Sequence, residues 1–406
     1  MMMKYEIKKI FSRTGGKISA ILLVFILLLT CYFATGVSYT NANGEDEHGF
    51  KAARTLRLAK KEWAGILDEE KLRAVLTENM RINALPEAQS KDVVLSNIAY
   101  GMKQGFSDIR DLLNRAFADG FRDYNYYKAD SLNINELGDF YQNRITLLQD
   151  WLNGEAKDQF SEPEKAYLVA QYETLKTPFY YDYSNGWQQL FEFSPTIIMI
   201  TMLILGYLVS GIFSSEFSLK ADSIFYSSVY GRNKAVTAKI KAGIFITTVF
   251  YFINMMLYTA IVLLYLGADS AGNPVQISWE NWKTFYHLTF WQEYLLIVTG
   301  GYIGCLFISL LTMFVSAKTK SGVLAVITPF ILIFLPSFVG FFESPVVNKI
   351  LGLLPDRLLQ VSSALTYFDL YSIGSKVVGA VPILFVVYGI LAVLLLPVIY
   401  MVYKKS

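Results

Sequence analysis

The chain has 406 residues, of which 53% are hydrophobic and only 17% are charged. A soluble protein usually carries about 25% charged residues, so this composition favours a membrane protein. The formal net charge of +2 gives no reason to expect nucleic acid as a partner. Two cysteines and two histidines leave little material for a disulfide or a metal centre, and neither a metal nor a cofactor is expected.

Residues 1–17 are predicted to form an amphipathic helix. Its apolar face holds Ile7, Ile10 and Phe11, and its polar face holds Lys4, Lys8 and Lys9. The lysines place this segment on the cytoplasmic side, before the first apolar run.

Six uncharged apolar runs follow the N-terminal segment. They lie at 18–37, 194–214, 242–266, 294–316, 322–341 and 378–403. Each has about 20 or more residues, which is enough for a helix to cross the hydrocarbon layer. The first run is longer than the core of a cleaved signal peptide and lacks a small-residue cleavage site, so we expect it to be retained as transmembrane helix 1. The predicted fold class is an all-α membrane protein with six transmembrane helices.

The basic residues predict the orientation of these helices. Lysines and arginines gather before the first run, between the second and third, between the fourth and fifth, and after the sixth. Because such residues are retained on the cytoplasmic side, both termini are expected in the cytoplasm. Residues 38–192 then form an extracytoplasmic domain, and residues 193–406 hold transmembrane helices 2–6 with a cytoplasmic segment at 214–241.

The predicted outer domain reads as mostly helical. Apolar residues three and four apart extend from Trp63 to Met80 and from Leu137 to Trp151, and Ser161 to Glu164 forms a capping box. A run of aromatic residues then precedes the second span and is typical of a belt at the lipid headgroups. It consists of Phe179, Tyr180, Tyr181, Tyr183, Trp187, Phe191 and Phe193. Ser194 and Pro195 are predicted to cap the second span.

Sequence motifs for several kinds of catalysis and transport are absent from this chain. The sequence contains no phosphate-binding loop, no nucleophile elbow and no His-Glu-x-x-His zinc motif, so no enzyme activity is expected. The spans hold no ionisable residue at mid-depth, which disfavours an ion-coupled transporter. Asn254 in the third span is interpreted as a hydrogen-bonding residue between helices.

The cytoplasmic segment 214–241 is the most informative part of the chain. Leu219, Ile224, Phe225 and Val229 recur at helical spacing, and Gly231 is suited to the end of a short helix. The basic residues Arg232, Lys234 and Lys239 follow. This pattern fits either a helix that lies on anionic lipid or a helix that docks onto a protein partner.

This segment resembles the signature of the ABC type-2 transporter permeases. Glu216, Ser227, Ser228, Gly231, Arg232 and Lys239 stand where that family has a glutamate, a small-residue pair, a turn, an arginine and a lysine. Lys220 departs from the glycine that is common there, and Val229 from a proline. Six spans, internal termini and a large outer domain after the first span also match many bacterial members.

The resemblance implies the permease subunit of a bacterial ABC exporter in the cytoplasmic membrane. A separate cytoplasmic ATPase would bind ATP, and the permease would form a homodimer or a heterodimer with a second permease. Glu216, Arg232 and Lys239 would orient the coupling helix by ion pairs, and Phe225 and Tyr226 would anchor it in the ATPase. Residues 1–17 would correspond to the family's interfacial elbow helix.

The substrate and the role of the outer domain stay open at the level of sequence. The resemblance favours export of, or immunity to, peptides or antimicrobial compounds. The alternative is a membrane sensor or assembly scaffold that transports nothing and whose outer domain binds a ligand. A membrane-embedded enzyme is disfavoured because no catalytic constellation is present.

Gly300 and Gly304 form a Gly-x-x-x-Gly pair in the fourth predicted span. Such pairs allow two helices to approach closely. The pair fits packing within one subunit or an interface between subunits. Prolines in the last two spans, at 329, 336, 382 and 397, are expected to kink those helices.

Overall fold

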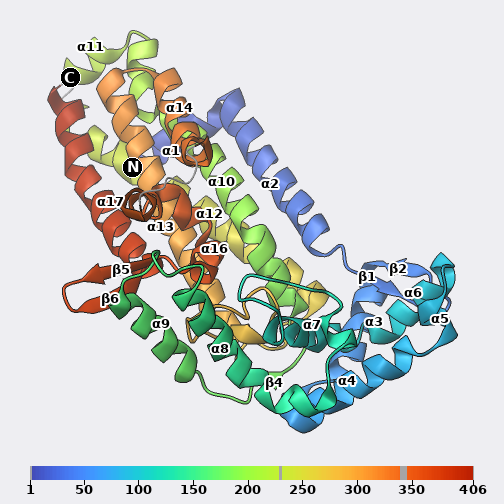
Figure 1. Cartoon of the computed structure of the whole chain (residues 1–406). Coiled ribbons are helices and arrows are strands. Elements are labelled where there is room, and N and C mark those ends of the chain that lie inside the picture. Colours follow the sequence, from blue (N-terminus) through green and yellow to red (C-terminus); the bar gives the residue numbers. More distant parts are fainter. Residues whose placement is uncertain (1, 228–230, 339–344, 406) are drawn as a thin grey trace.

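The computed structural model describes residues 2–227, 231–338 and 345–405 and is mostly helical, as predicted (Figure 1). Among these residues, five helices are long and apolar enough to cross a membrane. They are α2 (Thr14–Ala34), α10 (Asn185–Ser218), α12 (Val236–Leu266), α13 (Phe290–Thr319) and α17 (Ala380–Lys405). These helices support the assignment as a membrane protein.

The predicted fifth span gives a shorter helix than the others. Helix α14 (Gly322–Phe334) has 13 residues and continues as a 3-10 turn, η5 (Leu335–Phe338). Pro336 lies in that turn, and proline cannot donate the backbone hydrogen bond that a continuing α-helix needs. Residues 339–341, the end of the predicted run, lie outside the described residues.

Helix α10 begins earlier than the sequence suggested. The predicted cap at Ser194 and Pro195 is wrong, because both residues lie inside a continuous helix that starts at Asn185. Pro195 is accommodated in the interior of this helix, as prolines often are in membrane helices. The helix therefore projects beyond the predicted apolar run and into the neighbouring segment.

Helix α13 is the centre of the helical bundle and packs against α10, α12, α14 and α17. Gly300 and Gly304 lie on the side of α13 that meets η6 (Pro355–Leu359), α16 (Val361–Thr366) and α17. A Cβ atom on Gly300 would stand 2.5 Å from Cγ2 of Val361, and one on Gly304 would stand 3.2 Å from Cβ of Leu358. Both glycines thus allow close packing inside this chain.

Residues 35–184, between α2 and α10, form what we call the intervening segment, which packs at one end of the bundle (Figure 1). Its helices are α3 (Gly49–Glu62), α4 (Glu69–Asn83), α5 (Pro86–Gln89), α6 (Val93–Lys103), α7 (Ser107–Ala116), η1 (Lys128–Asp130), η2 (Ile134–Asp139), α8 (Phe140–Asn153) and α9 (Glu162–Glu173). Its strands are β1 (Ser38–Thr40), β2 (Asp46–His48), β3 (Gly65–Ile66) and β4 (Tyr180–Tyr181). β1 pairs with β2 and β3 with β4, both antiparallel.

The structure tests two helix predictions in the intervening segment. The capping box at Ser161 and Glu164 is confirmed at the start of α9. The helical periodicity from Trp63 to Met80 does not correspond to one helix, because α3 ends before Trp63 and α4 begins only at Glu69. Gly65 lies between them with φ of +144°, a conformation that breaks the helix and that glycine adopts readily.

The core of the intervening segment is shared with the rest of the chain. Leu72 and Leu76 of α4 belong to the same continuous buried cluster as Ile197 and Ile198 of α10. A second cluster joins Trp151 of α8 to more distant parts of the sequence. Those parts are the α12–α13 connection, which contains η4 (Val275–Ile277), and the antiparallel pair β5 (Leu370–Ile373) and β6 (Lys376–Gly379). The short helix α15 (Pro345–Leu351) precedes η6.

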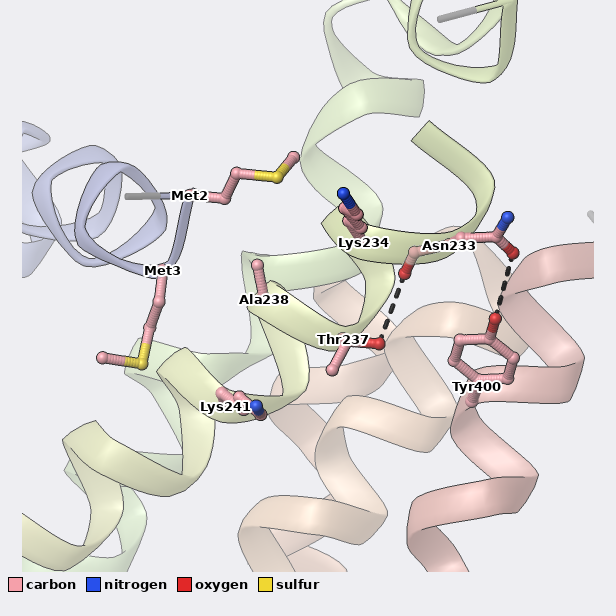
Figure 2. Close-up of a pocket in the computed structure, with 8 residues that line it drawn as sticks. All are labelled: Met2, Met3, Asn233, Lys234, Thr237, Ala238, Lys241 and Tyr400. Atoms are coloured by element: carbon pink, nitrogen blue, oxygen red, sulfur yellow. Dashed lines mark hydrogen bonds between the residues drawn. The ribbon is translucent and has the colours of Figure 1, made fainter. Parts of the chain in front are cut away.

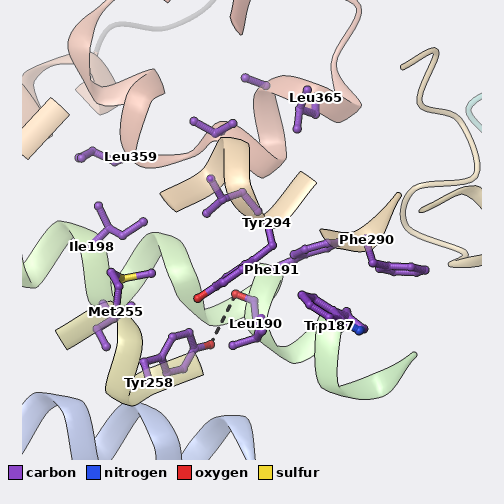
Figure 3. Close-up of a cluster of buried hydrophobic side chains, with 14 of the residues drawn as sticks. Trp187, Leu190, Phe191, Ile198, Met255, Tyr258, Phe290, Tyr294, Leu359 and Leu365 are labelled. Carbon is purple, nitrogen blue, oxygen red and sulfur yellow. Dashed lines mark hydrogen bonds between the residues drawn. The ribbon is translucent and has the colours of Figure 1, made fainter. Parts of the chain in front are cut away.

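The aromatic run before α10 is mostly core and does not form the predicted belt at the lipid headgroups. Phe179, Tyr181, Tyr183, Trp187 and Phe191 are buried, and only Tyr180 is exposed among the seven. Figure 3 shows Trp187 and Phe191 of α10 packed with Phe290 and Tyr294 of α13. These rings join the bundle to the parts of the chain that cover this end of it.

Candidate functional site at the α11 end of the helices

The opposite end of the bundle, where α10 finishes and α12 begins, is called the α11 end (Figure 1). There the carboxylate of Glu216 and the ammonium of Lys239 form an ion pair of 2.8 Å. The side chain of Lys239 is fully buried and that of Glu216 is 8% exposed. Lys239 also donates to the backbone carbonyl of Ile212 at 2.7 Å. This pair links α10 directly to α12.

The N-terminal helix α1 (Met2–Ser12) completes the charge network. Nζ of Lys9 lies 2.6 Å from the Glu216 carboxylate, and the carboxylate of Glu6 lies 3.3 Å from Nζ of Lys239. The hydroxyl of Tyr403 in α17 donates to Glu216 at 3.5 Å. Two cations and two carboxylates therefore balance one another, and together they connect four helices.

Helix α10 ends in a left-handed turn at Lys220. Its φ is +54°, the backbone N–H of Ala221 donates to the carbonyl of Glu216 at 2.8 Å, and that of Lys220 donates to Phe217 at 3.1 Å. These two bonds define a Schellman motif, in which glycine is favoured at the position of Lys220. Any other residue is strained there because its Cβ crowds the backbone.

Replacing Lys220 with glycine is expected to stabilise the protein by about 0.5–1 kcal/mol, because glycine relieves the left-handed strain. Lys220 is exposed, so little packing is lost. The free energy of unfolding in detergent would measure the gain. Lys220→Ala is the matched control, since it removes the charge and keeps the strain. A glycine variant no more stable than the alanine variant would contradict this account.

The connection from α10 to α12 contains the short helix α11 (Asp222–Ser227) and a π-helical turn, η3 (Gly231–Ala235). Gly231 is the first residue of η3. The sequence predicts that a short helix ends at Gly231, and residues 228–230, just before it, lie outside the described residues. The side chains of Phe225 and Tyr226, predicted as anchors in the ATPase, lie outside the described part of the chain. So does that of Arg232, predicted to orient the coupling helix by ion pairs.

A pocket of about 450 Å³ opens beside the charge network. Figure 2 shows that it lies between α1, the start of α12 and α17, with Lys234 and Lys241 at its wall. The hydroxyl of Tyr400 donates to the side-chain oxygen of Asn233 at 3.0 Å and joins two of these walls. The pocket is basic and polar, which suits an acidic group of a partner.

The structure brings together Glu216 and Lys239 from the predicted set and adds Lys9, Glu6 and Tyr403. Lys9 was assigned to the polar face of the N-terminal helix, but it points to Glu216. The one sequence signal for this contact is an amphipathic helix with lysines next to its apolar face. The ion pairs and hydrogen bonds of this network link α1, α10, α12 and α17 to one another.

Comparisons with known proteins add no family to these observations. No family model matches the sequence, and neither the curated proteins nor the solved structures yield a match.

Proposed function

We propose that this protein is the permease subunit of an ABC exporter, with six membrane spans, both termini in the cytoplasm and the intervening segment outside. α14 together with η5 would supply the short fifth span. The chain would work in the bacterial cell membrane as a homodimer or heterodimer of permeases. A separate cytoplasmic ATPase would bind and hydrolyse ATP. Peptides or antimicrobial compounds are the substrate class that the sequence resemblance favours.

The observation that carries this proposal is the buried ion pair between Glu216 and Lys239. It connects α10 and α12 across the segment that contains α11. The Schellman motif at Lys220 fixes how the chain leaves α10. A partner that displaced α11 would therefore move α10 and α12 together, whereas a loose loop would absorb the displacement. An ATPase shifts the permease between states only if it contacts this segment differently in each state.

A test of this proposal needs a variant that alters the surface and spares the buried network. Leu219 at the end of α10 is suitable because it is 67% exposed. Glu216 is unsuitable because its loss would damage the fold. We expect Leu219→Glu to reduce co-purification of an ATPase from the native host, measured by mass spectrometry after solubilisation in mild detergent. An unpaired charge at an interface core weakens binding by about tenfold or more.

Leu58→Glu is the matched control, since Leu58 is 56% exposed and lies on α3 in the intervening segment. The control variant should retain the ATPase at the wild-type level. If no ATPase co-purifies with the wild-type protein under conditions that preserve a known ABC complex, the exporter proposal is wrong. A kinase or regulator recovered in its place would favour the sensor or scaffold alternative.

A further inference from the structure

A second pocket, of about 850 Å³, lies at the opposite end of the bundle from the α11 end. It is formed by three parts of the chain that are distant in sequence: the intervening segment, the α12–α13 connection, and the residues from α15 to β5. Its volume falls within the range of about 300–1,000 Å³ that is usual for small-molecule sites. Unlike the α11-end pocket, it is lined by several aromatic rings.

The aromatic wall is a compact stack of three rings. The centroids of Phe121 and Trp151 are 5.0 Å apart, and Phe368 lies 5.6 Å from each of them. Phe121 and Trp151 line the pocket and are only 7% and 5% exposed, so the surrounding protein packs closely around this wall. A flat or apolar body could pack against these rings.

Two cations stand over the same rings. The guanidinium of Arg122 lies 4.9 Å from the Trp151 centroid, and Nζ of Lys283 lies 5.1 Å from the Phe121 centroid. Within the described residues, no carboxylate comes within 4.0 Å of either cation. Lys349 also lines the pocket but is already paired with Glu164 at 2.7 Å.

The charge of the pocket is unbalanced. Its lining has three basic side chains and one acidic side chain, Asp369. Burial, together with the positive charges of Arg115 and Arg122, lowers the pKa of Lys283 to about 8, and the negative charge of Asp123 opposes this shift in part. A lysine whose charged form is disfavoured in this way gains most from a bound anion.

The pocket adjoins a surface suited to lipid. Asn348 and Lys349 of α15 face the pocket, while Val346 and Ile350 of the same helix are 67% and 61% exposed. Exposed apolar residues beside a cationic site are the combination that a membrane amphiphile requires, because its tail and its head group need different surroundings.

We propose that this pocket binds an amphiphile whose phosphate head group carries a net negative charge, with the head group between Arg122 and Lys283 and the apolar body against the Phe121, Trp151 and Phe368 rings. The head group would neutralise two cations that lack a carboxylate, through charge-assisted hydrogen bonds. This inference goes beyond the proposed exporter function and does not depend on an ATPase.

The test uses the full chain in nanodiscs of phosphatidylcholine. Short-chain dihexanoyl phosphatidylglycerol, added from water, is expected to raise the Tm. Dihexanoyl phosphatidylcholine, which has no net charge, and glycerol phosphate, which has no apolar body, are expected to have little effect. Lys283→Met and Arg122→Met should each weaken the binding of dihexanoyl phosphatidylglycerol by about tenfold. Lys51→Met is the matched control, because the Lys51 side chain is 86% exposed and lies on α3.

A second arm places phosphatidylglycerol in the nanodisc bilayer instead. If phosphatidylglycerol in the bilayer raises the Tm and Lys283→Met removes that rise, the ligand comes from the membrane. If only the added short-chain compound raises the Tm, the ligand comes from the aqueous phase. The proposal is overturned if both arms leave the Tm unchanged. It is also overturned if phosphatidylcholine acts equally well, or if both pocket variants respond like the wild type.

Discussion

Glu216→Ala is expected to lower the free energy of unfolding by about 3–5 kcal/mol, because it leaves the buried ammonium of Lys239 without its main counter-charge. The side chain of Lys239 is fully buried, and Glu6 at 3.3 Å and the backbone carbonyl of Ile212 at 2.7 Å also contact its ammonium. The surrounding protein buries both side chains, so water has little access to replace the lost carboxylate. Equilibrium unfolding in mixed micelles with a denaturing detergent would measure the change.

A double-mutant cycle separates the buried pair from the exposed one. Glu216→Met combined with Lys239→Met removes both charges and should recover most of the stability lost by either single change. Lys9 has a side chain that is 33% exposed, so Lys9→Met should cost only about 1 kcal/mol. A central role for the buried pair would be contradicted if Lys9→Met and Glu216→Ala lowered the free energy of unfolding equally. It would also be contradicted if the double variant lost as much free energy of unfolding as the two single variants together.

The proximity of Glu216 and Lys239 follows from sequence, because a span ends just before one and another begins just after the other. Their connection is polar and charged and holds no apolar run that could cross a membrane, so both residues are expected at the same end of the bundle. The contributions of Glu6 and Lys9 could not be predicted in this way. They depend on where α1 docks, and an amphipathic pattern indicates an apolar face without identifying the surface that covers it.

The aromatic run before α10 shows a second limit. Trp187 and Phe191 fit a lipid belt by composition, yet both are buried against α13 and neighbouring elements. Lipid and protein interior are equally apolar, so composition does not distinguish them. The start of α10 was missed for a related reason. Pro195 is a common helix boundary in soluble proteins, but membrane helices tolerate proline in their interior.

The aromatic pocket had no local signal in the sequence. Arg122, Lys283 and Lys349 come from segments more than sixty residues apart and belong to no motif. Each of them alone reads as an ordinary surface cation. What makes them a candidate site is that the fold places two of them over buried rings, and only tertiary structure provides that information.

Arg144→Ala is expected to destabilise the protein by about 3–5 kcal/mol, because Arg144 connects α8 to the α12–α13 connection from a buried position. Its Nε donates to the carbonyl of Trp282 at 2.9 Å, and its Nη2 donates to that of Thr284 at 2.8 Å. Its guanidinium also lies 3.7 Å from the Tyr172 ring centroid. Truncation would remove the donor to the Trp282 carbonyl, would leave the Thr284 carbonyl with the longer bond from Gln276 at 3.3 Å, and would remove the cation from the ring.

Arg144→Lys keeps the charge but cannot reproduce the two parallel bonds of the guanidinium, so a loss of about 2 kcal/mol is expected. Arg73→Ala is the control, because the Arg73 side chain is 46% exposed in a surface ion pair and should cost less than about 1 kcal/mol. The carbonyls that Arg144 binds flank Lys283, so Arg144→Lys should also weaken phosphatidylglycerol binding while the protein remains folded. Unchanged unfolding for Arg144→Ala would show that the α12–α13 connection is held by its aromatic packing and not by this arginine.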